Sequence, residues 1–376
     1  MSVPRASVGD MDLTASTVDL AAAASDAVRL VPGRMVDPVL SGLLLAAGPD
    51  GVVLAANDRE RTVRLACPAV VHTDGRVLVP AKPLAETLKA IDAPEIRLVV
   101  EGARLAIRVP GARYALPLLD VDIHPGVPQP PELVGQVEAA PLAAALGTVA
   151  ATASRDDALP LYTGVRVRAD GDRLVLLATD RFRMAVATLP WQPAAPLDAL
   201  IPASLLTELA RQLPNTGTVS VHADRNRIAV AWASTVLTSA ILDGTAIHES
   251  KVPLSDVDTH LTLDADTLGA AVRRVGLYTD PRGTITLEVG DSDIRLRGTD
   301  QQSGEAEETV KSTVDGGRTG QSFQARYLLD ALRPFAGQAV HLALQPGMRA
   351  AVFTPATPSI PDLRYVVMPM RPPKPA

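Results

Sequence analysis

The chain has 376 residues, a formal net charge of −6 and a single cysteine, and these facts exclude several classes of protein. Cys67 alone forms neither an intramolecular disulfide nor a multi-cysteine metal site, and the six histidines show no ligand-type spacing. No apolar run approaches the roughly 20 residues of a membrane-spanning helix, and the first residues lack the apolar core of a secretory signal, so we expect a cytoplasmic protein without metal or other cofactor.

Length and composition predict a globular protein of two or three domains. Apolar residues make up 47% of the chain and charged residues only 21%, which is ample material for packed cores. The negative net charge does not exclude a nucleic-acid partner. Charges are screened beyond about 8 Å at physiological ionic strength, so local patches matter more than the total.

The first part of the chain predicts the order helix, strands, helix, strands. After a tail expected to be flexible (residues 1–10), a helical stretch begins near Val18. The segment 39–66 alternates around a Gly/Asp turn, which is typical of a two-stranded hairpin. Apolar residues at 84, 88 and 91 predict an amphipathic helix over 79–91, entered from a short strand. A second hairpin follows over 96–109.

The same order then occurs twice more. Helical stretches begin near Pro141 and Asp266, and second helices cover 201–213 and 323–335. First hairpins lie at 161–187 and 283–308, and second hairpins at 219–232 and 340–353. The Pro-rich stretch 124–135 and the polar stretch 248–258 separate the copies and are predicted linkers.

The spacing between matching residues establishes an internal repeat. Ala81, Ala203 and Ala325 stand 122 residues apart, as do Leu84, Leu206 and Leu328. Gly42 and Gly164 keep the same interval. A period of this length is not that of a solenoid, whose units run about 20–50 residues. The sequence therefore predicts an α+β protein of three tandem domains, each with two helices packed on antiparallel sheets, over 1–130, 131–256 and 257–376.

Basic residues recur on the second helix of each copy. Lys89, Arg211 and Arg333 occupy one position, and Lys82, Ser204 and Arg326 stand seven residues earlier on the same face. Helices that present Lys and Arg to a channel would hold phosphates without sequence preference, which permits sliding. The alternative is three solvated helix faces whose C-terminal cations complement the helix dipole.

Two stretches resemble a known family. Residues 178–186, Ala-Thr-Asp-Arg-Phe-Arg-Met-Ala-Val, and the ending 365–371, Tyr-Val-Val-Met-Pro-Met-Arg, are similar to the bacterial DNA polymerase III beta subunit, the beta sliding clamp. The loop 33–40 resembles that family's first-domain loop, and the likeness extends from about Met11 to Arg371. We expect an actinobacterial-type member or a specialised paralogue.

The resemblance implies a non-catalytic subunit of the polymerase III holoenzyme and a head-to-tail homodimer that forms a six-domain ring around duplex DNA. It implies tethering of the polymerase catalytic subunit, the clamp loader and other proteins through clamp-binding peptides. The peptide groove would comprise Thr179, Arg181, Phe182, Arg183, Met184, Val252, Met368, Pro369, Met370 and Arg371.

The DNA-facing residues are also expected from the resemblance, and most of them from helix position. Arg34 would lie on the first-domain loop, and the lining residues would be Arg29, Lys82, Lys89, Arg155, Arg211, Arg273, Arg274, Arg326 and Arg333. The subunit contact would join the first-domain edge, at residues 67–76, to Leu277 and Tyr278 of the third domain.

Three alternatives remain open at this point. Asp58, Asp180 and Asp300 could suggest an enzyme, but equivalent positions in three domains do not converge on one site, so we interpret them as turn residues that accept backbone hydrogen bonds. No GxxxxGK[ST] loop is present, so ring opening would need a separate ATPase. A scaffold that never encircles DNA would keep the groove alone.

A specialised clamp is the third alternative. Arg181, Phe182 and His248 depart from the residues usual in the family, so an altered groove could resist a groove-binding antibiotic.

Overall fold

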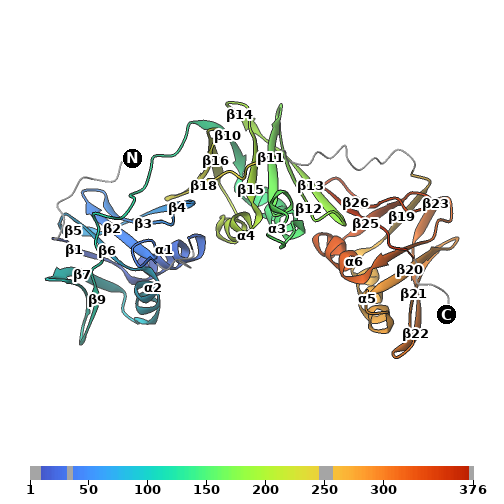
Figure 1. Cartoon of the computed structure of the whole chain (residues 1–376), viewed down its shortest axis with the longest axis horizontal. Helices are drawn as coiled ribbons and strands as arrows, with labels where there is room; N and C mark the ends of the chain where they lie inside the picture. Colours follow the sequence, from blue (N-terminus) through green and yellow to red (C-terminus); the bar gives the residue numbers. More distant parts are fainter. Residues whose placement is uncertain (1–9, 32–36, 245–256, 372–376) are drawn as a thin grey trace. The chain divides into compact units, whose positions relative to one another are not determined.

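A computed structural model describes residues 10–31, 37–244 and 257–371 of the chain (Figure 1). Contacts divide the chain into two compact units. Unit 1 comprises Met1–Ala140, Gln192–Leu197 and Arg211–Ile241, and unit 2 comprises Pro141–Trp191, Asp198–Ala210 and Leu242–Ala376. The predicted tails largely fall outside the described residues. Within the described residues, no helix is both long and apolar enough to span a bilayer.

The predicted helices are confirmed in all three repeats. The first helices are α1 (Thr17–Leu30), α3 (Ala139–Thr152) and α5 (Ala265–Val275). The second helices are α2 (Ala81–Ala90), α4 (Ala203–Gln212) and α6 (Ala325–Leu332). Each second helix begins at the repeated alanine, directly after the short strand β6 (Gly75–Pro80), β15 (Asp198–Pro202) or β24 (Gln321–Gln324).

The strands are more numerous than predicted. Each first hairpin is a three-stranded meander, formed by β2 (Gly42–Gly48), β3 (Gly51–Asn57) and β4 (Arg61–Cys67), by β11 (Gly164–Asp170), β12 (Arg173–Thr179) and β13 (Arg183–Pro190), and by β20 (Thr284–Val289), β21 (Asp293–Asp300) and β22 (Gly304–Lys311). The prediction of two strands was wrong because the second turn contains no glycine in the first two copies, so its sequence signal is weak.

The second hairpins also gain a third strand. They are β7 (Glu95–Glu101), β8 (Arg104–Val109) and β9 (Ala112–Pro117), then β16 (Thr218–Ala223), β17 (Arg227–Trp232) and β18 (Thr235–Ala240), then β25 (Ala339–Leu344), β26 (Ala351–Pro355) and β27 (Asp362–Val367). A strand also precedes each first helix: β1 (Asp12–Ser16), β10 (Leu133–Glu138) and β19 (Thr259–Asp264). The short strands β5 (Val70–Thr73), β14 (Gln192–Pro193) and β23 (Thr313–Gly316) complete the set.

Unit 1 contains two antiparallel sheets. The larger has the order β14-β10-β16-β17-β18-β4-β3-β2-β6, and the smaller has the order β5-β1-β7-β8-β9. Helix α1 packs against α2 and lies over β3 and β4 (Figure 1). The larger sheet is continuous across two repeats because β18 of the middle repeat pairs with β4 of the first.

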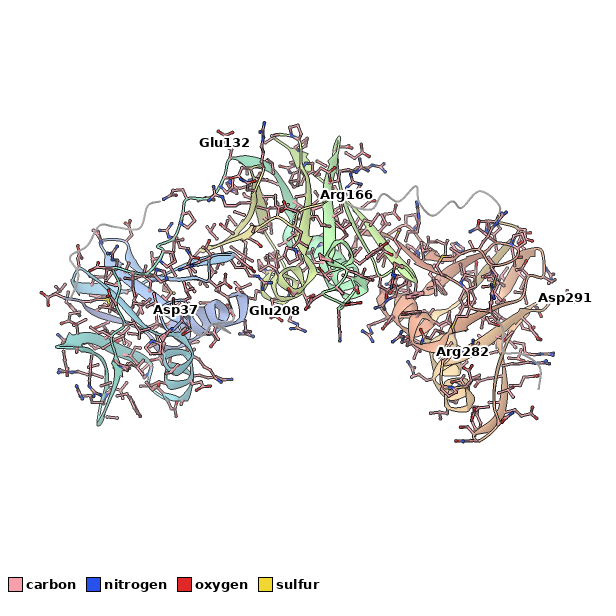
Figure 2. All side chains as sticks on the ribbon, viewed as in Figure 1. Asp37, Glu132, Arg166, Glu208, Arg282 and Asp291 are labelled. Atoms are coloured by element: carbon pink, nitrogen blue, oxygen red, sulfur yellow. The ribbon has the colours of Figure 1, made fainter. Side chains whose placement is uncertain are left out.

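Unit 2 is built in the same way. Its larger sheet has the order β15-β11-β12-β13-β27-β26-β25-β19-β23, and its smaller sheet the order β22-β21-β20-β24. Here β13 of the middle repeat pairs with β27 of the last. Helix α5 packs on α6 and on β21 and β22 (Figure 1). On β11, Arg166 (labelled in Figure 2) donates to Asp198 of β15 across 2.7–2.8 Å.

The repeated glycines have a common packing reason. A Cβ on Gly42 would lie 2.8 Å from Leu78, and a Cβ on Gly164 would lie 2.7 Å from Leu200. Leu78 and Leu200 are themselves 122 residues apart. The repeat therefore preserves a steric relation between two strands, because a close-packed core does not accommodate an added methyl group without a shift.

Candidate functional site

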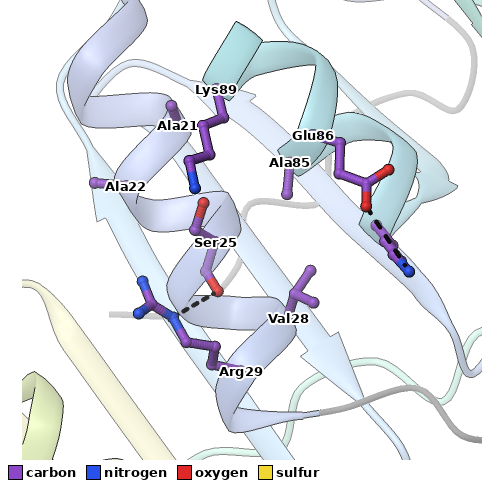
Figure 3. Close-up of a pocket in the computed structure, with 9 residues that line it drawn as sticks. Ala21, Ala22, Ser25, Val28, Arg29, Ala85, Glu86 and Lys89 are labelled. Atoms are coloured by element: carbon purple, nitrogen blue, oxygen red, sulfur yellow. Dashed lines mark hydrogen bonds and ion pairs between the residues drawn. The ribbon is translucent and has the colours of Figure 1, made fainter.

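The α1–α2 groove is a hollow in unit 1 between the first two helices (Figure 3). We define it as Ala21, Ala22, Ser25, Val28, Arg29, Lys82, Ala85, Glu86 and Lys89, and its volume is about 550 Å³. Small alanine side chains leave the space, and three predicted DNA-facing cations, Arg29, Lys82 and Lys89, surround it. The structure thus brings together three cations that helix position alone had predicted to face DNA.

The cations of the α1–α2 groove keep most of their exposure. Arg29 pairs with Asp26 at 3.0 Å, and burial raises the pKa of that carboxyl against the opposing effect of Arg29. Lys82 lies 3.8 Å from Glu86, with both side chains about 70% exposed. Exposed pairs at such distances are weak, about 0–1 kcal/mol, so a phosphate can replace these partners. The groove therefore has the chemistry of a low-specificity anion surface.

The other predicted DNA-facing residues are spread over the remaining helices. Arg211 is exposed on α4, and Arg273 and Arg274 are exposed at the end of α5. Arg274 is bound bidentately by Glu308 of β22, which raises the pKa of Arg274. Arg34 lies outside the described residues.

The three aspartates considered for catalysis are turn residues, as interpreted from the sequence. Asp58 Oδ1 accepts from the backbone N–H groups of residues 60 and 61, and Asp180 Oδ1 accepts from those of residues 182 and 183. Asp300 Oδ2 accepts from residues 302 and 303, and these amides lower its pKa. The carboxylates thus close equivalent turns in three repeats.

The arginine pocket lies in unit 2 and has a volume of about 510 Å³. It combines three residues predicted for the peptide groove with three predicted to face DNA. Five arginines and three aspartates line it, together with two aromatic rings: Arg155, Arg181, Arg183, Arg326, Arg333, Asp156, Asp180, Asp330, Phe182 and Tyr327, beside Ala151, Ala153 and Ser154.

Arg183 organises the floor of this pocket. Its side chain is 13% exposed and donates to Asp180, Asp330 and the hydroxyl of Tyr365. It also donates to the carbonyl of Ala151 at the end of α3. Burial opposes its charge, but Tyr365, Asp180 and Asp330 outweigh this and raise the pKa of Arg183. One guanidinium thus links four separate segments of unit 2.

Aromatic rings surround the neighbouring arginines. Phe182 stacks on Tyr327 with ring centroids 6.3 Å apart. The guanidinium of Arg181 lies 5.6 Å from the Phe182 centroid and 5.7 Å from that of Tyr162. Arg326 lies 4.6 Å from the centroid of Tyr327 and donates to its hydroxyl. Cation–π contacts of this kind restrict the turn that carries Arg181 and Phe182.

Substitution by glycine is expected to separate backbone strain from ring contact at this turn. Arg59 and Arg181 are equivalent and adopt left-handed φ angles of 78° and 80°. Arg59→Gly is expected to raise the free energy of unfolding by about 0.5–1 kcal/mol, since glycine adopts this conformation without steric cost. Arg181→Gly is expected to show no net gain because two ring contacts are lost. Urea unfolding of both variants measures the difference, and an equal gain would show that the ring contacts contribute nothing.

The side of the larger sheet of unit 2 that carries Met184, and against which Met368 packs, is called the methionine face here. Because successive residues of a strand point to opposite faces, Met184 points away from Arg183. Met184 packs with Leu177, Val186, Ala350, Val352 and Val366, and the partly buried Met368 lies against this cluster. The predicted groove set is therefore split, since Arg183 is buried on the helix side and Met184 lies on the methionine face.

The remaining groove residues are placed as follows. Met368 N–H donates to the carbonyl of Phe182 at 2.8 Å, so the chain ending reaches the turn. Met370 instead bonds to Ser322 of β24 through its N–H, and Pro369 and Arg371 flank it. Thr179 is buried and accepts from the N–H of Arg181, which gives it a role in the turn. Val252 and His248 lie outside the described residues.

The residues predicted for the subunit contact are accessible in the single chain. Leu277 is 74% exposed and Tyr278 39% exposed, on the short 3-10 turn after α5. In the first repeat the predicted edge contains β5, one of the two outermost strands of the smaller sheet, where Val70 is 64% exposed. Exposed apolar residues beside a sheet edge are suited to association.

Three residues that hold the arginines in place were not predicted as site residues. Tyr327 and Asp330 line the arginine pocket and contact Arg326 and Arg183, and Tyr365 lies beside the pocket and accepts from Arg183. The available signal was the spacing of Arg326, Asp330 and Arg333 along one helical face. Among the described residues no three His, Cys, Asp or Glu side chains are grouped to hold a metal ion. The single cysteine, Cys67, is buried, and burial raises the pKa of its thiol to about 11.

Comparison with known protein families covers nearly the whole chain. Models of the DNA polymerase III beta subunit match in order: its N-terminal domain at residues 11–128, its central domain at 136–246 and its C-terminal domain at 252–371. The chain is 29% identical to the beta sliding clamp of Streptomyces coelicolor over 364 residues, which covers 94% of this chain and 97% of the relative. It is also 29% identical over 301 residues to the beta sliding clamp homolog GriR of Streptomyces muensis, covering 78% and 80%.

Solved structures agree in fold. The DNA polymerase sliding clamp of Bacillus subtilis superposes with a TM-score of 0.90 at 20% identity, covering 96% of this chain and all of that one. The sliding clamp of Pseudomonas aeruginosa bound to griselimycin gives a TM-score of 0.90 at 24% identity, with the same coverage. With three tandem clamp domains in the expected order, this chain belongs to the DNA polymerase III beta subunit family.

Proposed function

We propose that the protein is a DNA sliding clamp, a processivity factor that encircles duplex DNA in the cytoplasm and carries out no catalysis itself. The observation that carries the proposal is the convergence of Arg29, Lys82 and Lys89 on one groove between helices, in a chain built of three clamp domains. Cations with weak partners hold a phosphate backbone at any sequence, which is what sliding requires.

The ring and its partners form the second part of the proposal. Two copies would join head to tail, with Leu277 and Tyr278 of one against the first-repeat edge of the other. The methionine face and the adjoining turn would accept clamp-binding peptides from the polymerase catalytic subunit and the clamp loader, because flexible thioethers adapt to varied side chains. The three domains are proposed at 1–130, 131–256 and 257–376.

Topological retention on DNA tests this function. Labelled protein is loaded by a cognate loader onto circular plasmid, and half of the sample is linearised before gel filtration. A clamp is expected to remain on the circle and to leave the linear form. Equal retention on both, or none on either with a competent loader, would mean a conventional binder or a scaffold.

A second candidate is a specialised clamp with an altered groove. Two observations favour it: the Arg181–Phe182 turn is restricted by ring contacts, and the relatives include the homolog GriR. We expect griselimycin to displace a fluorescent clamp-binding peptide at least about tenfold less well than from the Streptomyces coelicolor clamp. Equal displacement would leave the chain an ordinary clamp in this respect.

A further inference from the structure

The junction of the first two repeats copies the junction that carries the methionine face. In unit 1, Thr62 of β4 lies opposite Thr238 of β18. In unit 2, Met184 of β13 lies opposite Val366 of β27. Thr62 and Met184 are 122 residues apart, so the two strand pairs are equivalent in the repeat. The first junction therefore presents a sheet face with the same backbone and different side chains.

The turns beside the two junctions are also equivalent. Asp58 and Arg59 repeat the hydrogen bonds and the left-handed φ of Asp180 and Arg181. One position differs in chemistry. Asn57, in the place of Thr179, accepts from the N–H of Arg59 and in addition donates from Nδ2 to the carbonyl of Gly126 at 2.6 Å. A residue of the copied face thus binds the backbone of the linker.

The linker lies over this copied face. Val127 packs on a cluster that contains Ala55, and Ala55 stands 122 residues before Leu177 of the methionine face. Residues 127–130 enclose a cavity of about 80 Å³ with Thr62, Arg64, Val236 and Thr238. The segment forms neither helix nor strand, and two prolines restrict it. It therefore lies against the sheet face without regular secondary structure.

We propose that the first junction is a second, latent peptide-binding face, which the chain occupies with its own linker, Gly126–Pro130. The inference rests on the proposed peptide binding at the methionine face and limits the chain to one partner peptide. Tethering gives the linker a high effective concentration, so a peptide in solution competes poorly. The polar residues Thr62, Arg64 and Thr238, in place of Met184, Val186 and Val366, further disfavour an apolar ligand.

Two variants of the full chain test this inference with a fluorescein-labelled clamp-binding peptide as probe. The linker variant carries Asn57→Thr, Val127→Gly, Pro128→Gly and Pro130→Gly, where Asn57→Thr keeps a hydroxyl acceptor for the turn but removes the bond to Gly126. The grafted variant adds Thr62→Met and Thr238→Val. Cooperative unfolding and retained peptide binding at the methionine face establish that the linker variant and the grafted variant are folded.

The expected stoichiometries differ among the three proteins. The unaltered chain binds one peptide, the linker variant binds a second at least about tenfold more weakly, and the grafted variant binds two with affinities within about tenfold. Met184→Thr added to the grafted variant leaves only the new site. Bound peptide is expected to slow hydrogen exchange in β4 and β18 of the grafted variant and not of the unaltered chain.

Two results would overturn the inference in distinguishable ways. A folded grafted variant that still binds one peptide, without slower exchange in β4 and β18, shows that the first junction is only structural. An unaltered chain that binds no peptide removes the proposed groove, and the inference fails with it.

Discussion

Arg183→Met is expected to lower the free energy of unfolding by about 3 kcal/mol, the largest effect of any single substitution at the candidate site. The change leaves the carboxylates of Asp180 and Asp330 without their buried partner, and it removes donors from Tyr365 and Ala151. A buried charge that loses its partner keeps its desolvation cost, which is why breaking such a pair costs more than the pair contributes. Urea unfolding measures the loss.

Arg333→Met is the matched control. Arg333 lies 3.3 Å from the same Asp330, but its side chain is 77% exposed, so its loss is expected to cost less than about 1 kcal/mol. A double-mutant cycle with Asp330→Asn should give a coupling energy above about 1 kcal/mol for Arg183 and near zero for Arg333. Equal costs for the two arginines would show that Arg183 does not organise the pocket.

Neutralising the α1–α2 groove is expected to shorten retention on circular DNA at least about tenfold. The triple variant Arg29→Gln, Lys82→Gln and Lys89→Gln removes the cations that surround the groove. Each phosphate contact contributes about 0.9 to the slope of log K against log salt, so the slope should fall by up to roughly 3. The dissociation rate of loaded protein at several salt concentrations is the measurement.

The control removes three charges from the same unit at another place. Arg97, Arg108 and Arg113 lie on the smaller sheet and pair there with Asp12 and Glu101. Their replacement by Gln changes the net charge equally, and we expect little change in retention. If both triple variants lose retention alike, total charge rather than the groove controls binding. If neither does, the α1–α2 groove is not the DNA surface.

The repeat made much of the fold predictable. The 122-residue spacing placed each second helix to within two residues of its observed start, because the same packing recurs in every copy. The third strand of each meander was missed. Asp58, Asp180 and Asp300 were interpreted as turn residues, but Arg59 and Arg181, which follow the first two, adopt a left-handed φ that residues other than glycine rarely adopt and that the sequence does not signal.

The sequence predicted many of the residues of the candidate site, but it did not predict which of them lie together. Arg183 and Met184 are neighbours in one sequence motif, but they lie on opposite faces of the sheet because successive residues of a strand alternate in direction. Arg155 and Arg326 join Phe182 in one pocket although 171 residues separate the two arginines, and no local pattern carries that information. Contacts between distant segments depend on which strands pair, and a short segment of sequence does not determine that pairing.

The continuous sheets have a consequence for how the chain can be divided. Strand β18 of the middle repeat pairs with β4 of the first repeat, and β13 of the middle repeat pairs with β27 of the last. The middle repeat therefore depends on both neighbours for strand partners. Excised alone, it would present two bare rows of amide and carbonyl groups, each a template for aggregation with another copy. The repeating unit of the sequence is therefore smaller than the unit that folds by itself. One repeat is a third of the chain, whereas a part that pairs all its strands must be larger than one repeat.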